Sequence, residues 1–147
     1  MINPKHIGAL VSRHTAEVEA GRLRFFAKAT GQTDPRYVNV AAALRRGDPG
    51  LPVPPTFLYC LDMDAPNPRA LIELLDIDIG RVLHGEQSFT YHRIAYAGER
   101  LQFETRIVDI YAKKNGALEF VVCDTHVSNV AGERVANLRS TIAVRNT

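Results

Sequence analysis

The sequence contains few cysteines and no long hydrophobic run. Its two cysteines, Cys60 and Cys123, form no Cys-x-x-Cys spacing and have no nearby histidine pair, which excludes the usual zinc-binding patterns. Both lie in apolar stretches, where we expect buried, reduced thiols. No apolar segment approaches the ~18 residues of a membrane-spanning helix, and Arg13 and His14 interrupt the N-terminal stretch, unlike a secretory signal. We therefore expect a cytoplasmic protein without a metal site or a membrane partner.

The sequence also lacks a large excess of charge of either sign. It has 18 Lys and Arg residues against 16 Asp and Glu residues, a net charge of +2, and the basic residues are scattered. Nucleic-acid binders of this size normally show a basic stripe, so we expect no nucleic-acid partner. The 147 residues, 46% hydrophobic and 23% charged, have the composition and length of one globular domain covering 1–147.

Apolar periodicity and chain breakers divide the first half into short helices. Leu23, Phe26 and Ala27 share one helical face, and Gly31 is well placed to end that helix. The proline-rich stretch 47–55 reads as a rigid loop rather than a domain linker, because neither side has enough residues for a core of its own. The expected elements are a short strand at 17–19 and helices at 21–30, 40–46, 56–63 and 69–75.

The apolar period changes to two in the second half. Leu101, Phe103 and Ile107 alternate with polar residues, as in a half-buried strand. Asn115-Gly116 is a strong hairpin signal, because both turn positions need a positive φ. The expected antiparallel strands lie around 81–93, 101–107, 118–123 and 135–144.

Strand length and one apolar helix together predict the fold. Strands of about 12 residues reach ~40 Å, so a small sheet built from them must curl and fill its concave face. The helix at 56–63 is apolar on nearly all sides and suits that place. We therefore predict an α+β hot-dog fold, a long curved antiparallel sheet wrapped around a central helix. Its unpaired strand edges favour a dimer joined edge to edge.

Three segments resemble a known family. Residues 83–93 (LHGEQSFTYHR) and 97–101 (AGERL) resemble a signature of MaoC-like dehydratase amino-terminal domains, also called fatty-acid-synthase-like dehydratase domains. Residues 53–57 (VPPTF) resemble the start of that family's central helix, and the resemblance extends over about 14–145. It implies a hot-dog protein that handles acyl thioesters, carried on coenzyme A or on an acyl carrier protein, without a further cofactor.

The resemblance also implies a chemistry for which this chain lacks parts. Active hydratases of the superfamily add water to a 2-enoyl thioester with an Asp and a His in a Gly-Asp-x-Asn-Pro-x-His loop, and with a Gly amide in a His-Gly step at the helix start. Here the loop at 31–37 has Gln32 for the Asp and Tyr37 for the His. Gln is no base, and a tyrosine ordinarily titrates near ~10. Pro54-Pro55 replaces His-Gly, and proline has no amide proton.

These departures match the partner half of a paired hydratase. In the two-domain and two-subunit members, one hot-dog half has the Asp and His, and the other shapes the acyl tunnel. We therefore expect a subunit of an (R)-specific enoyl-thioester hydratase or 3-hydroxyacyl-thioester dehydratase, beside a catalytic MaoC-like partner. The alternatives are a self-sufficient homodimeric hydratase or acyl-CoA thioesterase, and a non-catalytic acyl-CoA binding module.

Candidates for direct chemistry lie in the strand segment around Gly85 and in the altered loop. At positions i and i+2 of a regular strand, His84 and Glu86 would share a face and act as an acid/base pair. The alternative is that this segment makes structural hydrogen bonds, with Gly85 marking a bulge or a close backbone approach. Asp34 would orient water or, alternatively, cap the turn before Pro35.

Candidates for substrate binding gather at the loop and the helix start. Tyr37 would reach the acyl site with its hydroxyl or lie buried at a subunit seam. Thr56 would sit where helix amides favour a polarised group or simply begin the helix, and Phe57 would serve the core first and the tunnel second. The candidate set is Gln32, Tyr37, Thr56, Phe57 and Tyr91.

Overall fold

The computed structural model describes residues 1–146. The strands are β1 (Leu10–Glu17), β2 (Val82–Tyr91), β3 (Arg100–Lys113), β4 (Leu118–Asn129) and β5 (Arg134–Arg145). The helices are α1 (Ala20–Ala29), α2 (Val40–Arg45), α3 (Phe57–Asp62) and α4 (Ala70–Leu74), with 3-10 turns η1 (Pro4–His6), η2 (Pro35–Tyr37) and η3 (Ile79–Arg81). No helix in this part of the chain is long and apolar enough to cross a membrane.

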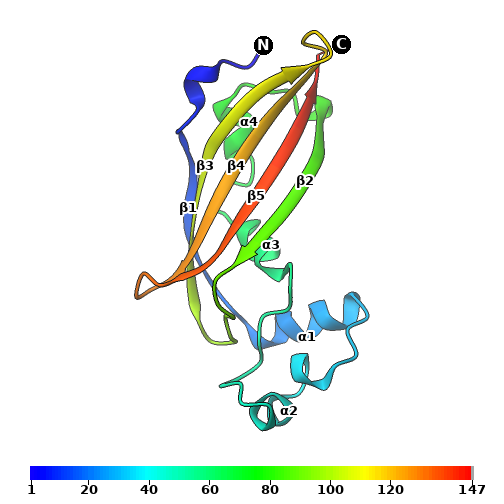
Figure 1. Ribbon diagram of the computed structural model, residues 1–147, viewed down its shortest axis with the longest axis vertical. Helices are drawn as coiled ribbons and strands as arrows, with labels where there is room; N and C mark the ends of the chain where they lie inside the picture. The colour runs from blue at the N-terminus through cyan, green and yellow to red at the C-terminus, as the bar shows by residue number, and fades with distance from the viewer. Residues whose placement is uncertain (147) are drawn as a thin grey trace.

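The five strands form one antiparallel sheet in the order β1-β3-β4-β5-β2. The sheet is long and curved, and α3 lies against its concave side, with α1 and α2 at one end and α4 toward the other (Figure 1). The predicted α+β hot-dog fold is therefore confirmed.

The strand β1 precedes the strand expected at 17–19 and overlaps it only at Glu17, so that prediction is wrong. Seven of its eight residues have partners on β3, with His14 opposite Phe103 and Ala16 opposite Leu101, and the register shifts at Val11. The inward side chains include a histidine and a small alanine, so the hydrophobic alternation by which strands are recognised is weak here. Tertiary pairing, rather than its own apolar pattern, makes this segment a strand.

The central helix is buried because its apolar residues point in nearly every direction. Leu61 is fully buried and Phe57 and Leu58 nearly so, between the sheet and α1. The core also includes Phe103 and Leu138 of the concave face. Each such side chain contributes about 1.5–3 kcal/mol on burial. This packing fixes both ends of α3 relative to the sheet, and the two cavities described below lie at those ends.

The predicted rigid loop and hairpin are both present. In the proline-rich stretch, the Val53 N–H donates to the Ala95 carbonyl at 2.8 Å, and Leu51 accepts from the Ala97 N–H at 2.9 Å. Between β3 and β4, Asn115 has φ 51° and Gly116 has φ 86°, as the hairpin signal required.

Candidate functional site

One cavity of about 260 Å³ lies at the N-terminal end of α3. It joins three parts of the chain that the resemblance singled out: the altered loop through Tyr37, the helix start through Pro55, and the end of β2 through Tyr91. The lining is mainly apolar and consists of Tyr37, Pro52, Val53, Pro55, Leu58, Tyr91, Arg93, Ile94, Ala95 and Val135. The fold therefore brings Tyr37 and Tyr91 together at one mainly apolar cavity.

The backbone amide at the helix start is already hydrogen bonded. The Thr56 N–H donates to the Tyr91 hydroxyl oxygen at 2.8 Å. Thr56 precedes the first helical residue, Phe57, and has φ 71°, in the left-handed region. Pro54 and Pro55 have no amide proton, so Thr56 provides the first amide after the proline pair. Phe57 lines neither cavity described here; it packs edge-on against Phe26 in the core, with ring centroids 5.2 Å apart.

Two of the loop candidates shape the loop and do not line the cavity. Asp34 accepts the Arg36 N–H at 2.9 Å and pairs with Arg46 at 2.8 Å. The Arg36 N–H, together with the Arg46 guanidinium, holds the pKa of the Asp34 carboxyl below its usual value. Gln32 is exposed, and its side-chain oxygen accepts the Asp34 N–H at 3.0 Å. The capping alternative for Asp34 is therefore the one that the geometry favours.

Tyr37 is positioned by an ion pair that sequence analysis missed. Arg36 donates two hydrogen bonds to the buried Asp48 carboxylate, at 2.6 and 2.7 Å, and the Tyr96 hydroxyl adds a third at 3.2 Å. Arg36 lowers the pKa of Asp48. This pair ties η2 to the proline-rich loop and thereby holds Tyr37 at the cavity. Asp48 precedes a proline in a turn-rich stretch, where aspartate is common. Its position in the sequence therefore gave no sign of the ion pair.

The expected pairing of His84 with Glu86 is wrong. In the β2–β5 ladder His84 lies opposite Ile142 and Glu86 lies opposite Thr141, so Gly85 is an extra, bulged residue. A bulge shifts the alternation by one residue. His84 therefore faces the concave side, whereas Glu86 faces the outer side of the sheet. The alternative reading of Gly85 as a bulge is confirmed.

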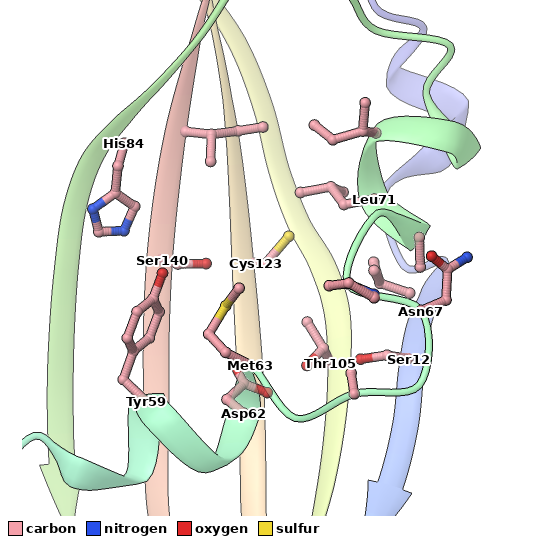
Figure 2. Close-up of a pocket in the computed structure, with 16 residues that line it drawn as sticks. Ser12, Tyr59, Asp62, Met63, Asn67, Leu71, His84, Thr105, Cys123 and Ser140 are labelled. Atoms are coloured by element: carbon pink, nitrogen blue, oxygen red, sulfur yellow. The ribbon is translucent and has the colours of Figure 1, made fainter. Parts of the chain in front are cut away.

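A second cavity of about 200 Å³ lies at the C-terminal end of α3, between the sheet and the α4 region (Figure 2). His84 lines it, with its ring centroid 5.9 Å from that of Tyr59. Asp62 also lines it and accepts a hydrogen bond from the Thr125 hydroxyl at 3.3 Å. Burial raises the pKa of the Asp62 carboxyl. Sequence analysis overlooked Asp62, although a lone carboxylate at the end of an apolar helix was the available signal.

Neither cysteine is suited to nucleophilic chemistry. Both thiols are free; Cys123 is buried, as expected, whereas Cys60 is only half-buried. Burial raises the pKa of Cys60, and that of Cys123 to about 12. A thiol is nucleophilic as the thiolate, and both groups are protonated at neutral pH.

Comparison with protein families agrees with this geometry. Residues 5–138 match the family described as the FAS1-like dehydratase domain region. The chain belongs to that family. It is 34% identical to a UPF0336 protein of Saccharopolyspora erythraea over 131 residues, covering 89% of this chain and 83% of the relative. A UPF0336 protein of Streptomyces coelicolor is 32% identical, with 89% and 87% coverage.

Solved structures share the family's fold. A chain of the truncated HadBC (3R-hydroxyacyl-ACP dehydratase) complex of Mycobacterium tuberculosis superposes with a TM-score of 0.80 at 24% identity, covering 94% of this chain and 96% of that one. A chain of the ChsH1-ChsH2 complex of the same organism gives 0.76 at 24% identity, with 94% and 89% coverage. The FAS1-like dehydratase domain described here therefore has the hot-dog fold of hydratases and dehydratases.

Proposed function

We propose that this chain is the non-catalytic half of an enoyl-thioester hydratase or 3-hydroxyacyl-thioester dehydratase, paired with a catalytic MaoC-like subunit. The main observation is the lining of the first cavity, which includes no Asp, Glu or His among the residues that the structure describes. Hydration of an enoyl thioester needs a base to activate water and an acid to deliver a proton to the α-carbon. The partner supplies both groups, and this chain shapes the acyl site.

The hydrogen bond between Thr56 and Tyr91 also supports a non-catalytic role for this chain beside a catalytic partner. A thioester oxygen that gains enolate charge needs amide donors aimed at it. In this chain the Thr56 N–H at the helix start donates to the Tyr91 hydroxyl instead. The oxyanion donors therefore belong to the partner's central helix.

The edge of the sheet offers the place for the partner. Within residues 1–146, β2 is paired on one side only, with β5. It is mostly exposed, and Leu83 and Tyr91 are 49% and 46% exposed. An unpaired strand edge is a template for a strand of another chain, and pairing there would bring the partner close to the Tyr91 cavity. HadBC and ChsH1-ChsH2, which share this fold, are complexes of two chains.

The proposal is tested by reconstitution. The chain is co-expressed with a hot-dog chain that has the Gly-Asp-x-Asn-Pro-x-His loop, and crotonyl-CoA hydration is measured for each chain and for the pair. We expect co-purification, and turnover by the pair at least 10² times that of this chain alone. Full activity of the isolated chain would instead establish the self-sufficient homodimer. Binding of crotonyl-CoA in calorimetry without turnover in any pairing would establish a non-catalytic binding module.

A further inference from the structure

Asp62 is the one carboxyl among the described residues that line the second cavity, whose lining also includes His84. Its hydrogen bond comes from the Thr125 hydroxyl at 3.3 Å, and none of the ion pairs within residues 1–146 includes it. It lies at the C-terminal end of α3, where the backbone carbonyls also disfavour negative charge. A half-buried carboxyl in such a place costs stability, and an apolar residue there would suit a purely apolar ligand better.

Hydroxyl groups continue from Asp62 across the concave face of the sheet. The Thr105 and Thr125 hydroxyls lie 2.8 Å apart, and both residues are buried. Ser12 is opposite Thr105 in the β1–β3 ladder, and Ser12 and Thr105 line the cavity with Asp62. On the β4–β5 side, Ser140 also lines the cavity (Figure 2). The cavity thus has a polar floor, formed by Ser12, Asp62, Thr105 and Ser140, beneath walls that are mostly apolar but include Asn67 and His84.

An unsatisfied acceptor lies beside this floor. Gln87 is opposite Ser140 in the β2–β5 ladder, so the two side chains point to the same side of the sheet. The Gln87 side-chain oxygen is buried and finds no hydrogen-bond partner within residues 1–146. A buried polar group without a partner costs about 1–3 kcal/mol. The concave side beside the cavity therefore retains an acceptor without a donor, although Gln87 does not itself line the cavity.

The chemistry of this floor selects among ligand groups. A plain methyl end adds no hydrogen bond to the one that Asp62 accepts from Thr125, and a carboxylate would have to lose the hydration of its own charge among mostly apolar walls. An ammonium would need Asp62 to be ionised, which burial disfavours. A hydroxyl can donate to Asp62 when it is ionised and accept from it when it is protonated, and it can exchange hydrogen bonds with Thr105 and Ser140.

We propose that the second cavity binds the far end of an acyl chain and selects a chain that bears a hydroxyl group there. This inference rests on the proposed function, because it assigns the thioester end of the chain to the Tyr37–Tyr91 cavity. The two cavities lie at opposite ends of the six-residue helix α3, whose axis is about 9 Å long. A medium-length chain laid along that helix would place its distal hydroxyl at Asp62.

The test compares two probes of equal length, decanoyl-CoA and 10-hydroxydecanoyl-CoA, by calorimetry on the full chain and on its co-purified complex. We expect the hydroxylated probe to bind about tenfold more tightly, the effect of one net hydrogen bond to a charged or polarised group. In Asp62→Leu this preference disappears or reverses. Asp109→Asn, which removes an exposed carboxylate of β3, keeps it. Asp62→Leu should remain folded, because it replaces a half-buried carboxyl by an apolar group of similar size.

Equal affinities of the wild type for the two probes overturn the inference, as does a preference that persists in Asp62→Leu. Absence of binding of either probe, to the chain and to the complex, overturns it as well. Because binding is measured without turnover, the two proposals fail separately. A pair that hydrates crotonyl-CoA but shows equal affinities rejects only the hydroxyl selection. A chain that shows the preference but gains activity with no partner rejects only the paired hydratase.

Discussion

The Tyr91 hydroxyl is the acceptor for the Thr56 amide at the start of the central helix. Tyr91 comes from the end of β2, so this one hydrogen bond connects the edge strand, the helix and the first cavity. Its loss leaves the amide to water and frees the ring to move. The residue therefore contributes both to stability and to the shape of the acyl site.

Replacing Tyr91 by Phe removes that acceptor and keeps the ring. We expect the free energy of unfolding to fall by about 1 kcal/mol, which lowers the melting temperature by about 3 °C. Calorimetric melting of the purified chain measures the change. Tyr111→Phe is the control, because Tyr111 packs its ring on Phe120 at 5.0 Å. An equal loss in both variants would show that the Tyr91 hydroxyl is not used.

Asp62 should give stability an unusual dependence on pH. Because burial raises its pKa in the folded chain, the folded state holds this proton more tightly than the unfolded state. Its contribution is therefore most favourable below the unfolded pKa of ~3.9 and is lost as pH rises through the higher folded pKa. Asp62→Asn removes this loss.

Melting of Asp62→Asn and the wild type between pH 4 and 8 tests this sign. The stability of the variant relative to the wild type should increase with pH, and Asp109→Asn should show no such trend. A relative stability that falls with pH would mean that the folded chain favours the ionised carboxylate.

The bulge in β2 decides which side chains of that strand face the cavities. A Cβ at Gly85 would lie 3.1 Å from the Thr141 carbonyl oxygen, closer than a backbone neighbour easily allows. Gly85→Ala should therefore cost about 1–3 kcal/mol through overpacking, or force the strand out of its register. Ser88→Ala, on the outer side of the same strand, should change stability by less than about 0.5 kcal/mol. Urea unfolding of the two variants makes the comparison.

Elements with a strong local signal could be predicted, whereas those set by tertiary pairing could not. The apolar run around Leu58 identified the buried helix, and Asn115-Gly116 identified the hairpin. The strand β1 was not predicted at its true position, because its inward residues include His14 and its apolar alternation is weak. The faces of His84 and Glu86 were predicted wrongly, because the bulge between them depends on pairing with the neighbouring strand. At the site, the resemblance pointed to Tyr37, whereas Asp62 acquires its importance only from burial.

At the scale of the whole molecule, the sheet formed by residues 1–146 has two edges, β1 and β2, and of these only β2 borders the first cavity. Leu83 on β2 is 49% exposed, and Leu10 on the opposite edge strand, β1, is 43% exposed. Leu83→Lys should weaken association with the catalytic partner about tenfold or more, because a leucine loses its burial and a charge enters the interface. Sedimentation of the pair at several concentrations measures this. Leu10→Lys is the matched control, and an equal effect there would place the partner on β1.

The left-handed backbone of Thr56, with φ 71°, bears on how this protein can be engineered. A β-branched residue is unfavourable in this conformation and is retained only where its surroundings dictate the backbone. Glycine adopts the same φ freely, so Thr56→Gly should raise the free energy of unfolding by up to about 1 kcal/mol while leaving the Tyr91 hydrogen bond in place. Thermal melting would register the gain. The turn before the helix is thus a position at which the protein can be made more heat-resistant while the residues that line the acyl site stay unchanged.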